Sequence, residues 1–103
     1  MQPIELEVNQ ENIDEGSRDS CRWCPIAIAL LRFDWQTYLG LDKLPHVEVS
    51  VGDCNMHVSL PSLLRKLRID TTIEARDFIY KFDRTGRDAV VPTTFTLQPV
   101  ETE

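Results

Sequence analysis

Apolar and polar residues alternate along two segments of the chain, one near each end. Residues 4–8 read Ile-Glu-Leu-Glu-Val, and residues 93–98 place Phe95 and Leu97 between threonines. A period of two is typical of a strand with one buried face. We therefore predict a strand in each segment. We expect Pro99 to end the second strand and to leave a loose acidic tail.

Residues 46–51 and 54–60 are predicted to form a β-hairpin, because valine and other apolar residues recur at every second position of both. Only a glycine and an aspartate lie between them, which predicts a two-residue turn of type II′. The predicted cross-strand pairs are Val51–Cys54, Val49–Met56 and Val47–Val58. In this register Cys54 faces the core and His57 faces outward.

The most apolar part of the chain is predicted to be a central helix that begins at Pro25, where the missing N–H of proline costs nothing. The residues that follow are apolar almost all round, which indicates a buried helix. Cys24 or Ser20 would lie near its cap. The helix either continues to Gly40 or is followed by a second short helix from Asp34.

Two further helices are predicted, one on each side of these elements. Residues 10–15 follow a favourable asparagine cap, and Gly16 is expected to end that helix in a left-handed conformation. Residues 71–82 carry an apolar stripe, and Thr71 and Glu74 have the spacing of a capping box.

Residues 61–70 fit both a short leucine-rich helix and a strand. We favour a strand from Arg65, because a hairpin of two strands makes a poor sheet by itself. The element order is then strand, helix, strand, strand, strand, helix, strand. It predicts a single α+β domain over residues 1–103, with a small, mainly antiparallel sheet and two main helices packed on one face.

Composition and charge narrow the function classes. The chain has 103 residues and a formal net charge of −6, which argues against direct nucleic-acid binding, because that needs a basic surface. The N-terminus has neither the basic nor the apolar region of a signal peptide, and three cysteines are an odd number for a disulfide framework. The central helix is too short to span a membrane. We expect an acidic, cytoplasmic protein with reduced thiols.

Cys21, Cys24, Cys54 and His57 have the residue types and local spacings of a zinc site. The predicted hairpin opposes this reading, because residues three apart on a strand point to opposite faces. Cys54 and His57 could share one ion only if residues 53–57 formed a loop. The first two cysteines also have the spacing of a redox dithiol at a helix N-terminus, without the strand that normally delivers that motif.

The sequence contains no glycine-rich phosphate loop and no hydrolase or metalloprotease motif. His46 and His57 share the outward face of the hairpin with serines and a glutamate, which are also ordinary residues of a solvent-facing strand. We therefore expect no catalysis and no cofactor, with a zinc-stabilised module as the alternative.

Binding is the function that the remaining features favour. Two aromatic residues three positions apart on a helix are predicted to anchor a partner, the acidic first strand offers a second contact surface, and three bases between positions 65 and 68 offer a third. The candidate contact residues are Trp35, Tyr38, Glu5, Glu7, Arg65, Lys66 and Arg68. If the bases lined a cleft between subunits, the protein would instead be an oligomer that sequesters a small ligand such as a nucleotide.

Three motifs resemble those of a group of small uncharacterised proteins of bacteriophages and bacteria, often actinobacteria. They are Asn-Ile-x-x-Gly at residues 12–16, Cys-Pro-Ile-Ala-x-Ala-Leu at residues 24–30 and Phe-Ile-x-x-Phe-Asp at residues 78–83. The resemblance implies a compact α+β accessory protein and assigns no catalytic residue. We expect such a protein to act by binding a protein of its host, in the host cytoplasm if it is phage-encoded, and to form a homodimer.

Overall fold

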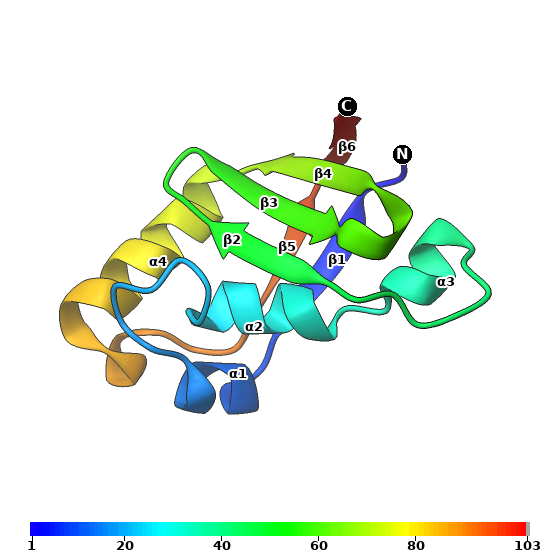
Figure 1. The fold of residues 1–103 in the computed structure, drawn as a ribbon. Coiled ribbons are helices and arrows are strands. Elements are labelled where there is room, and N and C mark those ends of the chain that lie inside the picture. The colour runs from blue at the N-terminus through cyan, green and yellow to red at the C-terminus, as the bar shows by residue number, and fades with distance from the viewer. Residues whose placement is uncertain (103) are drawn as a thin grey trace.

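The computed structural model describes residues 1–102, and within them the chain forms strands, α-helices and two short 3-10 helices (Figure 1). The strands are β1 (Ile4–Val8), β2 (Glu48–Val51), β3 (Asn55–Leu60), β4 (Arg65–Asp70), β5 (Thr93–Leu97) and β6 (Pro99–Thr102). The helices are α1 (Gln10–Glu15), α2 (Pro25–Arg32), α3 (Trp35–Leu39) and α4 (Ile73–Thr85), with the 3-10 turns η1 (Pro61–Leu63) and η2 (Arg87–Ala89).

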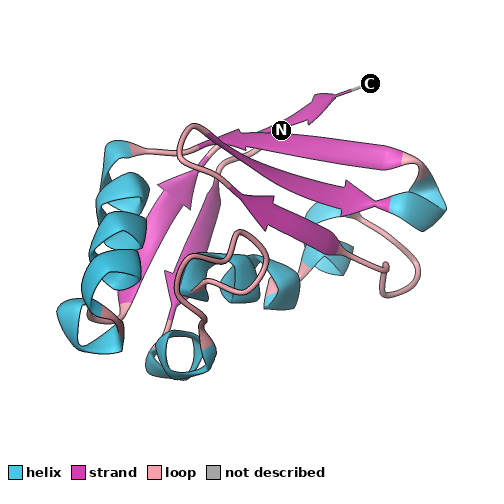
Figure 2. Ribbon diagram, turned by 60° about the vertical axis from the view of Figure 1, so that its left-hand side comes forward, coloured by secondary structure: helices cyan, strands magenta, loops and turns pink. Residues whose placement is uncertain are grey.

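The strands are divided between two antiparallel sheets, which confirms the α+β class but replaces the one predicted sheet by two. One sheet pairs β1 with β5, and the other has the order β2-β3-β4-β6. In Figure 2 the larger sheet lies across the top, while α4 and α2 stand on either side of the two-stranded sheet beneath it. Both sheets and these two helices contribute side chains to one hydrophobic core.

Alternation along the strands places the core as the sequence predicts. Residues Ile4, Leu6 and Val8 of β1 are buried while the glutamates between them are exposed, and β5 buries Phe95 and Leu97. Helix α2 buries every residue from its first to Leu30, in agreement with an apolar helix at the centre of the fold.

The chain turns sharply after α2, so α3 is a separate short helix. The side chain of Asp34 caps α3 by accepting a hydrogen bond from the N–H of Thr37 at 3.1 Å. Gly40 ends the helix with φ +67, a left-handed conformation that glycine adopts without steric cost. The second of the two sequence alternatives is therefore correct.

The predicted register of the β2–β3 hairpin is wrong by two residues. The observed pairs are Val51–Met56, Ser50–His57, Val49–Val58 and Glu48–Ser59. Cys54 therefore lies in the turn and is exposed. Contacts from Thr71 hold the turn in this place: its N–H donates to the carbonyl of Cys54 and its hydroxyl donates to the carbonyl of Gly52, both at 2.9 Å. An even shift leaves the apolar face unchanged.

Two helix ends differ from their predictions. Gly16 has φ −67, so it does not end α1 in a left-handed conformation. Glycine is required at this position by close packing, because a Cβ there would lie 2.7 Å from Cδ of Pro25. Helix α4 is capped by Thr72, whose hydroxyl accepts from the N–H of Ala75 at 3.1 Å. Thr71 is instead buried against the hairpin turn.

As far as Thr102 the C-terminal segment is not loose, contrary to the sequence prediction; Glu103, the last residue of the predicted tail, lies outside the described residues. Residues Pro99–Thr102 form β6, which pairs with β4 and makes it an interior strand. Pro99 is buried opposite Ile69, and Glu101 accepts two hydrogen bonds from Arg65, at 2.9 and 2.7 Å. A proline that starts an edge strand is compatible with the ladder, because its missing N–H need not be paired.

Candidate functional site

The predicted aromatic anchors do not form a surface. Trp35 is 1% exposed, and its indole N–H donates to the carbonyl of Leu30 at 2.7 Å. Tyr38 is half-buried and its hydroxyl donates to the carbonyl of Gln2. Both rings pack edge-on against each other and against Phe33. These aromatics stabilise the junction between α3 and the start of the chain. Because Trp35 is buried there, it is not available as an interface residue.

The four candidate zinc ligands are placed in different settings. Cys24 is buried at the cap of α2, where its sulfur accepts from the N–H of Ala27 at 3.4 Å, and burial raises the pKa of its thiol. Cys21 and Cys54 are exposed in loops, and His57 is exposed on β3. Over residues 1–102, no three His, Cys, Asp or Glu side chains are grouped as metal ligands would be.

The three bases of β4 do not share a face, because successive residues of a strand alternate. Arg65 forms the bidentate pair with Glu101, which raises the pKa of Arg65 and lowers that of Glu101. Lys66 and Arg68 are exposed on the opposite face, where Arg68 lies 3.5 Å from Asp70. Within one chain these three bases therefore do not converge on one cleft.

The predicted acidic surface on β1 is exposed. Glu5 accepts hydrogen bonds from the hydroxyl of Thr96 on the neighbouring strand, at 2.9 and 3.0 Å. Glu5 and Glu7 also line a shallow groove that reaches α1 and α2, where Arg32 lies 3.5 Å from Glu11. The charge of this groove is thus partly compensated within the chain.

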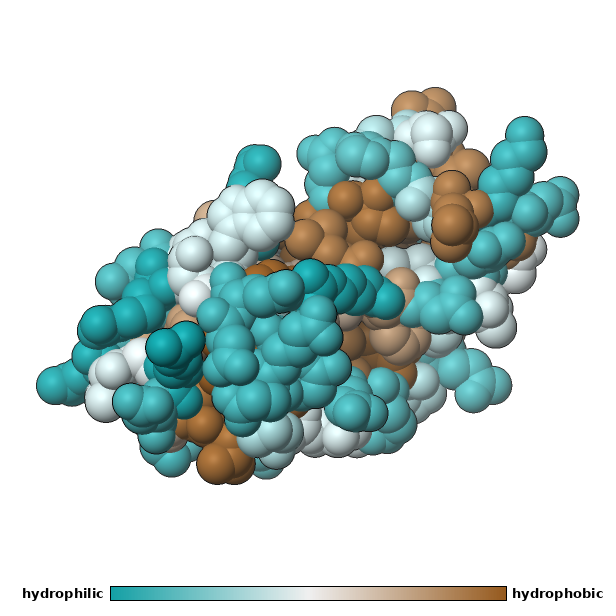
Figure 3. All heavy atoms as spheres, turned by 90° about the horizontal axis from the view of Figure 1, so that it is seen from below, coloured by the Kyte–Doolittle hydropathy of each residue, from teal (hydrophilic) through white to brown (hydrophobic). Residues whose placement is uncertain are grey.

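Apolar side chains reach the surface in separate patches between hydrophilic ones, as the view from below shows (Figure 3). The large exposed apolar and aromatic residues are Met1, Trp23, Leu44, Leu63, Leu64, Ile73, Tyr80, Val91 and Val100. One of them, Val91, which is 70% exposed, lies at the mouth of a groove between α4 and β5.

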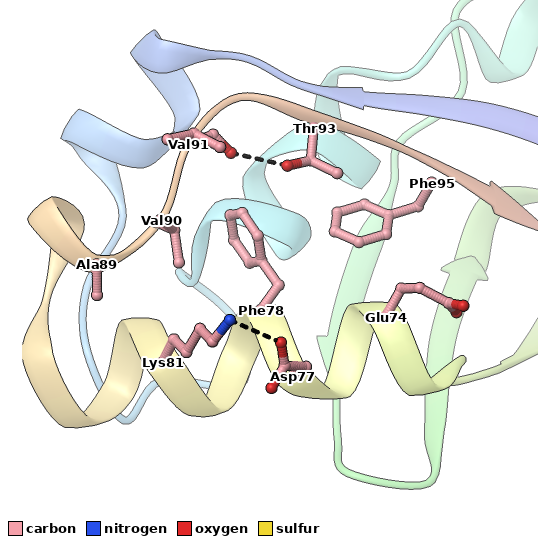
Figure 4. A pocket seen from close by; sticks show the side chains of 9 residues that line it. All are labelled: Glu74, Asp77, Phe78, Lys81, Ala89, Val90, Val91, Thr93 and Phe95. Carbon is pink, nitrogen blue, oxygen red and sulfur yellow. Dashed lines mark hydrogen bonds and ion pairs between the residues drawn. The ribbon is translucent and has the colours of Figure 1, made fainter.

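This α4–β5 groove has an apolar floor and a charged rim (Figure 4). Its floor is formed by Phe78 of α4, by Phe95 of β5 and by Val90, and the two phenyl rings meet edge-on with centroids 5.5 Å apart. Successive turns of α4 place Glu74, Asp77 and Lys81 along the rim. The hollow has a volume of about 260 Å³.

The charges on the rim are unequal. Lys81 lies 3.0 Å from Asp77 and offsets its charge. Among the described residues Glu74 has no such ion pair, so it leaves the rim with a net negative charge. Exposed ion pairs of this kind stabilise the fold little. The net charge of a rim does, however, favour ligands of the opposite charge.

The groove is bordered by Thr93 and Phe95 of β5, a strand whose only strand partner among residues 1–102 is β1. Edge strands usually carry charges, proline or a bulge that discourage pairing with another chain. Here β1 has two glutamates, β2 has Glu48, and β6 has Pro99 and Glu101. By contrast, Thr93–Leu97 contains no charged residue and no proline. Of the four edge strands, β5 is therefore the one whose own sequence carries neither a charge nor a proline.

Sequence reasoning did not find this groove. The sequence does show that residues 93–97 carry no charge. That this segment lies at a sheet edge beside α4 is visible only in the structure.

Comparison of the chain with family models, with curated proteins and with solved structures found no match. Within residues 1–102 no helix is long and apolar enough to cross a membrane.

Proposed function

We propose that this protein is a small, non-catalytic binding module that captures an extended segment of a partner protein along β5. The observation that carries the proposal is the uncharged open edge of β5 beside an apolar groove. An extended peptide that pairs with such an edge gains main-chain hydrogen bonds from the strand and side-chain contacts from the neighbouring pocket. It would add a third strand to a two-stranded sheet, which is marginal by itself.

The rim and floor of the groove define the chemistry of the segment. An apolar side chain of the peptide would rest on Phe78 and Phe95, and a basic side chain next to it would meet Glu74. The formal net charge of −6 over the whole chain favours the approach of the same kind of partner. The partner is thus expected to present alternating apolar and basic residues in an extended segment.

The cellular setting of this binding is part of the same proposal, and it is supported by the resemblance of three motifs to proteins of phages and bacteria. A small acidic accessory protein of a phage or bacterium would act in the cytoplasm and would capture a protein of the host. It would modulate that protein by occupying one of its extended segments, without catalysing a reaction.

Fluorescence anisotropy with a defined probe tests the proposal. The probe is a fluorescein-labelled peptide that alternates lysine and valine, and its matched control alternates glutamate and valine. We expect saturable binding of the lysine peptide only. Glu74→Lys should weaken it about tenfold, as expected for a charge that contacts the ligand directly. Glu48→Lys changes the net charge equally, but Glu48 lies on β2 and does not line the groove, so this variant should keep an affinity near that of the wild type.

Strand pairing itself is tested with two further probes, methylated on alternate main-chain nitrogens. A methylated amide cannot donate to the ladder, so only the peptide whose methyl groups face β5 should lose binding. Equal binding of both peptides would refute strand addition, and failure of the lysine peptide to bind at all would refute the proposed specificity. Equal effects of the two charge reversals would show attraction by net charge alone.

A further inference from the structure

Three exposed leucines lie in the loop after α3 and in the η1 turn; two of them, Leu44 and Leu63, line one hollow, and Leu64 follows Leu63 in the chain. Leu44 is 83% exposed, Leu64 is 93% exposed and Leu63 is 40% exposed. A hollow lined by residues 40–45, Ser62 and Leu63 joins the two segments. We call Leu44, Leu63 and Leu64 the apolar tip. Single exposed leucines are ordinary on protein surfaces, but adjacent ones around a hollow mark interaction sites.

Leu64 is unusual in its backbone as well as in its exposure. Its φ of +53 places it in the left-handed region, which is unfavourable for a large L-residue and normally filled by glycine, asparagine or aspartate. The N–H of Leu64 donates to the carbonyl of Pro61 at 3.1 Å, which holds the turn. The side chain that this turn projects is almost fully exposed. The backbone strain and the exposed apolar side chain thus coincide at one residue, and such strain is typical of functional positions.

The charges around the apolar tip are balanced, unlike those of the chain as a whole. Asp42 and Lys43 precede Leu44, and Arg65, which follows Leu64, is paired with Glu101. Most of the surface of this acidic protein repels a second copy electrostatically, but the apolar tip does not. In a twofold contact the same surface patch of both copies meets face to face. An acid and a base that are adjacent in one copy can therefore lie opposite the base and the acid of the other copy.

We propose that two copies of the chain associate about a twofold axis through the apolar tip, with Leu44 and Leu64 as anchors. Lys43 of each copy would then lie near Asp42 of the other. Burial of the Leu64 side chain at the centre of the contact would then offset the free-energy cost of its strained backbone.

The position of the tip leaves the α4–β5 groove accessible in such a dimer. Figures 1 and 2 both show α4 at one end of the elongated molecule and α3 and η1 at the other. A dimer through the tip would hold two grooves far apart. The association itself does not depend on what the groove binds.

Sedimentation velocity over a concentration series tests the dimer. We expect the wild type to dimerise, and Leu44→Asp and Leu64→Asp each to weaken the dimer at least about tenfold. Ile73→Asp introduces the same charge on an exposed apolar residue of α4, outside the groove lining, and should leave the dimer intact. A wild type that stays monomeric at its highest soluble concentration would overturn the proposal. A dimer that tolerates both leucine changes would also overturn it.

A charge exchange provides a test that does not alter the leucines. Asp42→Lys and Lys43→Asp each place like charges opposite one another in a twofold contact, so each variant alone should dimerise weakly. When the two variants are mixed, opposite charges face each other again, and a heterodimer should form in preference to either homodimer. Both residues are exposed, so folding is expected to be unaffected. Native mass spectrometry distinguishes the species, and a mixture without heterodimer would contradict the twofold arrangement.

Discussion

Replacement of Gly16 by alanine should destabilise the fold by steric conflict with one proline ring. The added Cβ would lie 2.7 Å from Cδ and 2.8 Å from Cγ of Pro25, well inside ordinary contact distance. The ring is rigid and buried at the start of α2, so it cannot turn away as a long side chain would. Overpacking of this kind costs about 1–3 kcal/mol, which lowers the melting temperature of a domain of this size by roughly 4–12 °C.

A double-mutant cycle isolates the cause. Pro25→Ala removes the ring, and it should cost about 1 kcal/mol on its own through lost burial and a less restricted unfolded chain. In the double variant the new methyl group meets no ring, so the two changes should cost less together than the sum of their separate effects. We expect a coupling free energy of about 1–2 kcal/mol, within the range that residues in contact show. Urea unfolding followed by circular dichroism measures all four corners of the cycle.

Gly40→Ala is the matched control. Gly40 has φ +67, and a Cβ there would meet nothing within 4 Å. Its replacement should cost about 1–2 kcal/mol through backbone conformation alone. That cost should simply add to the cost of Pro25→Ala. If Gly16→Ala is equally additive with the proline change, or leaves stability unchanged, close packing against the ring is not the reason for glycine at position 16.

Three further predictions follow from burial and pairing. Of the two single-tryptophan variants, the one that keeps Trp35 should fluoresce at shorter wavelength than the one that keeps the exposed Trp23, and equal spectra would contradict the burial of Trp35. Glu101 has a lowered pKa because of its hydrogen bonds with Arg65, so its contribution to stability is complete above its ordinary pKa of 4.5 and is lost as the pH falls below that value. Arg65→Ala should return the pKa of Glu101 towards 4.5 in an NMR titration, and an unchanged value would refute the pairing. Cys24 should resist alkylation in the folded protein while the other two thiols react, and simultaneous labelling of all three would show that its site is open.

Local sequence pattern determined most of the elements. The alternation in β1, the apolar run of α2 and the stripe of α4 each identify an element and the face that it buries, because these periods follow from backbone geometry alone. The asparagine cap of α1 was also correctly predicted, since a cap depends only on residues a few positions away.

The same pattern could not determine how these elements meet. A register shift of two residues keeps every side chain on its face, so the valines of β2 fit both registers equally, and a hydrogen bond from Thr71, far along the chain, selects one. Trp35 and Tyr38 have the spacing of one helical face, but whether that face is covered depends on α2 and on the start of the chain. The tail became β6 because β4 offered it an unpaired edge.

The candidate site, the α4–β5 groove, also depends on tertiary packing. Phe78 and Phe95 are each recognisable in the sequence as core positions, yet the groove between them exists only because α4 stands beside the open edge of β5. The sequence by itself determined which residues are apolar and in what period they recur. Which apolar surfaces cover one another, and which remain exposed, was decided by tertiary packing, because burial depends on neighbours that are distant in the chain.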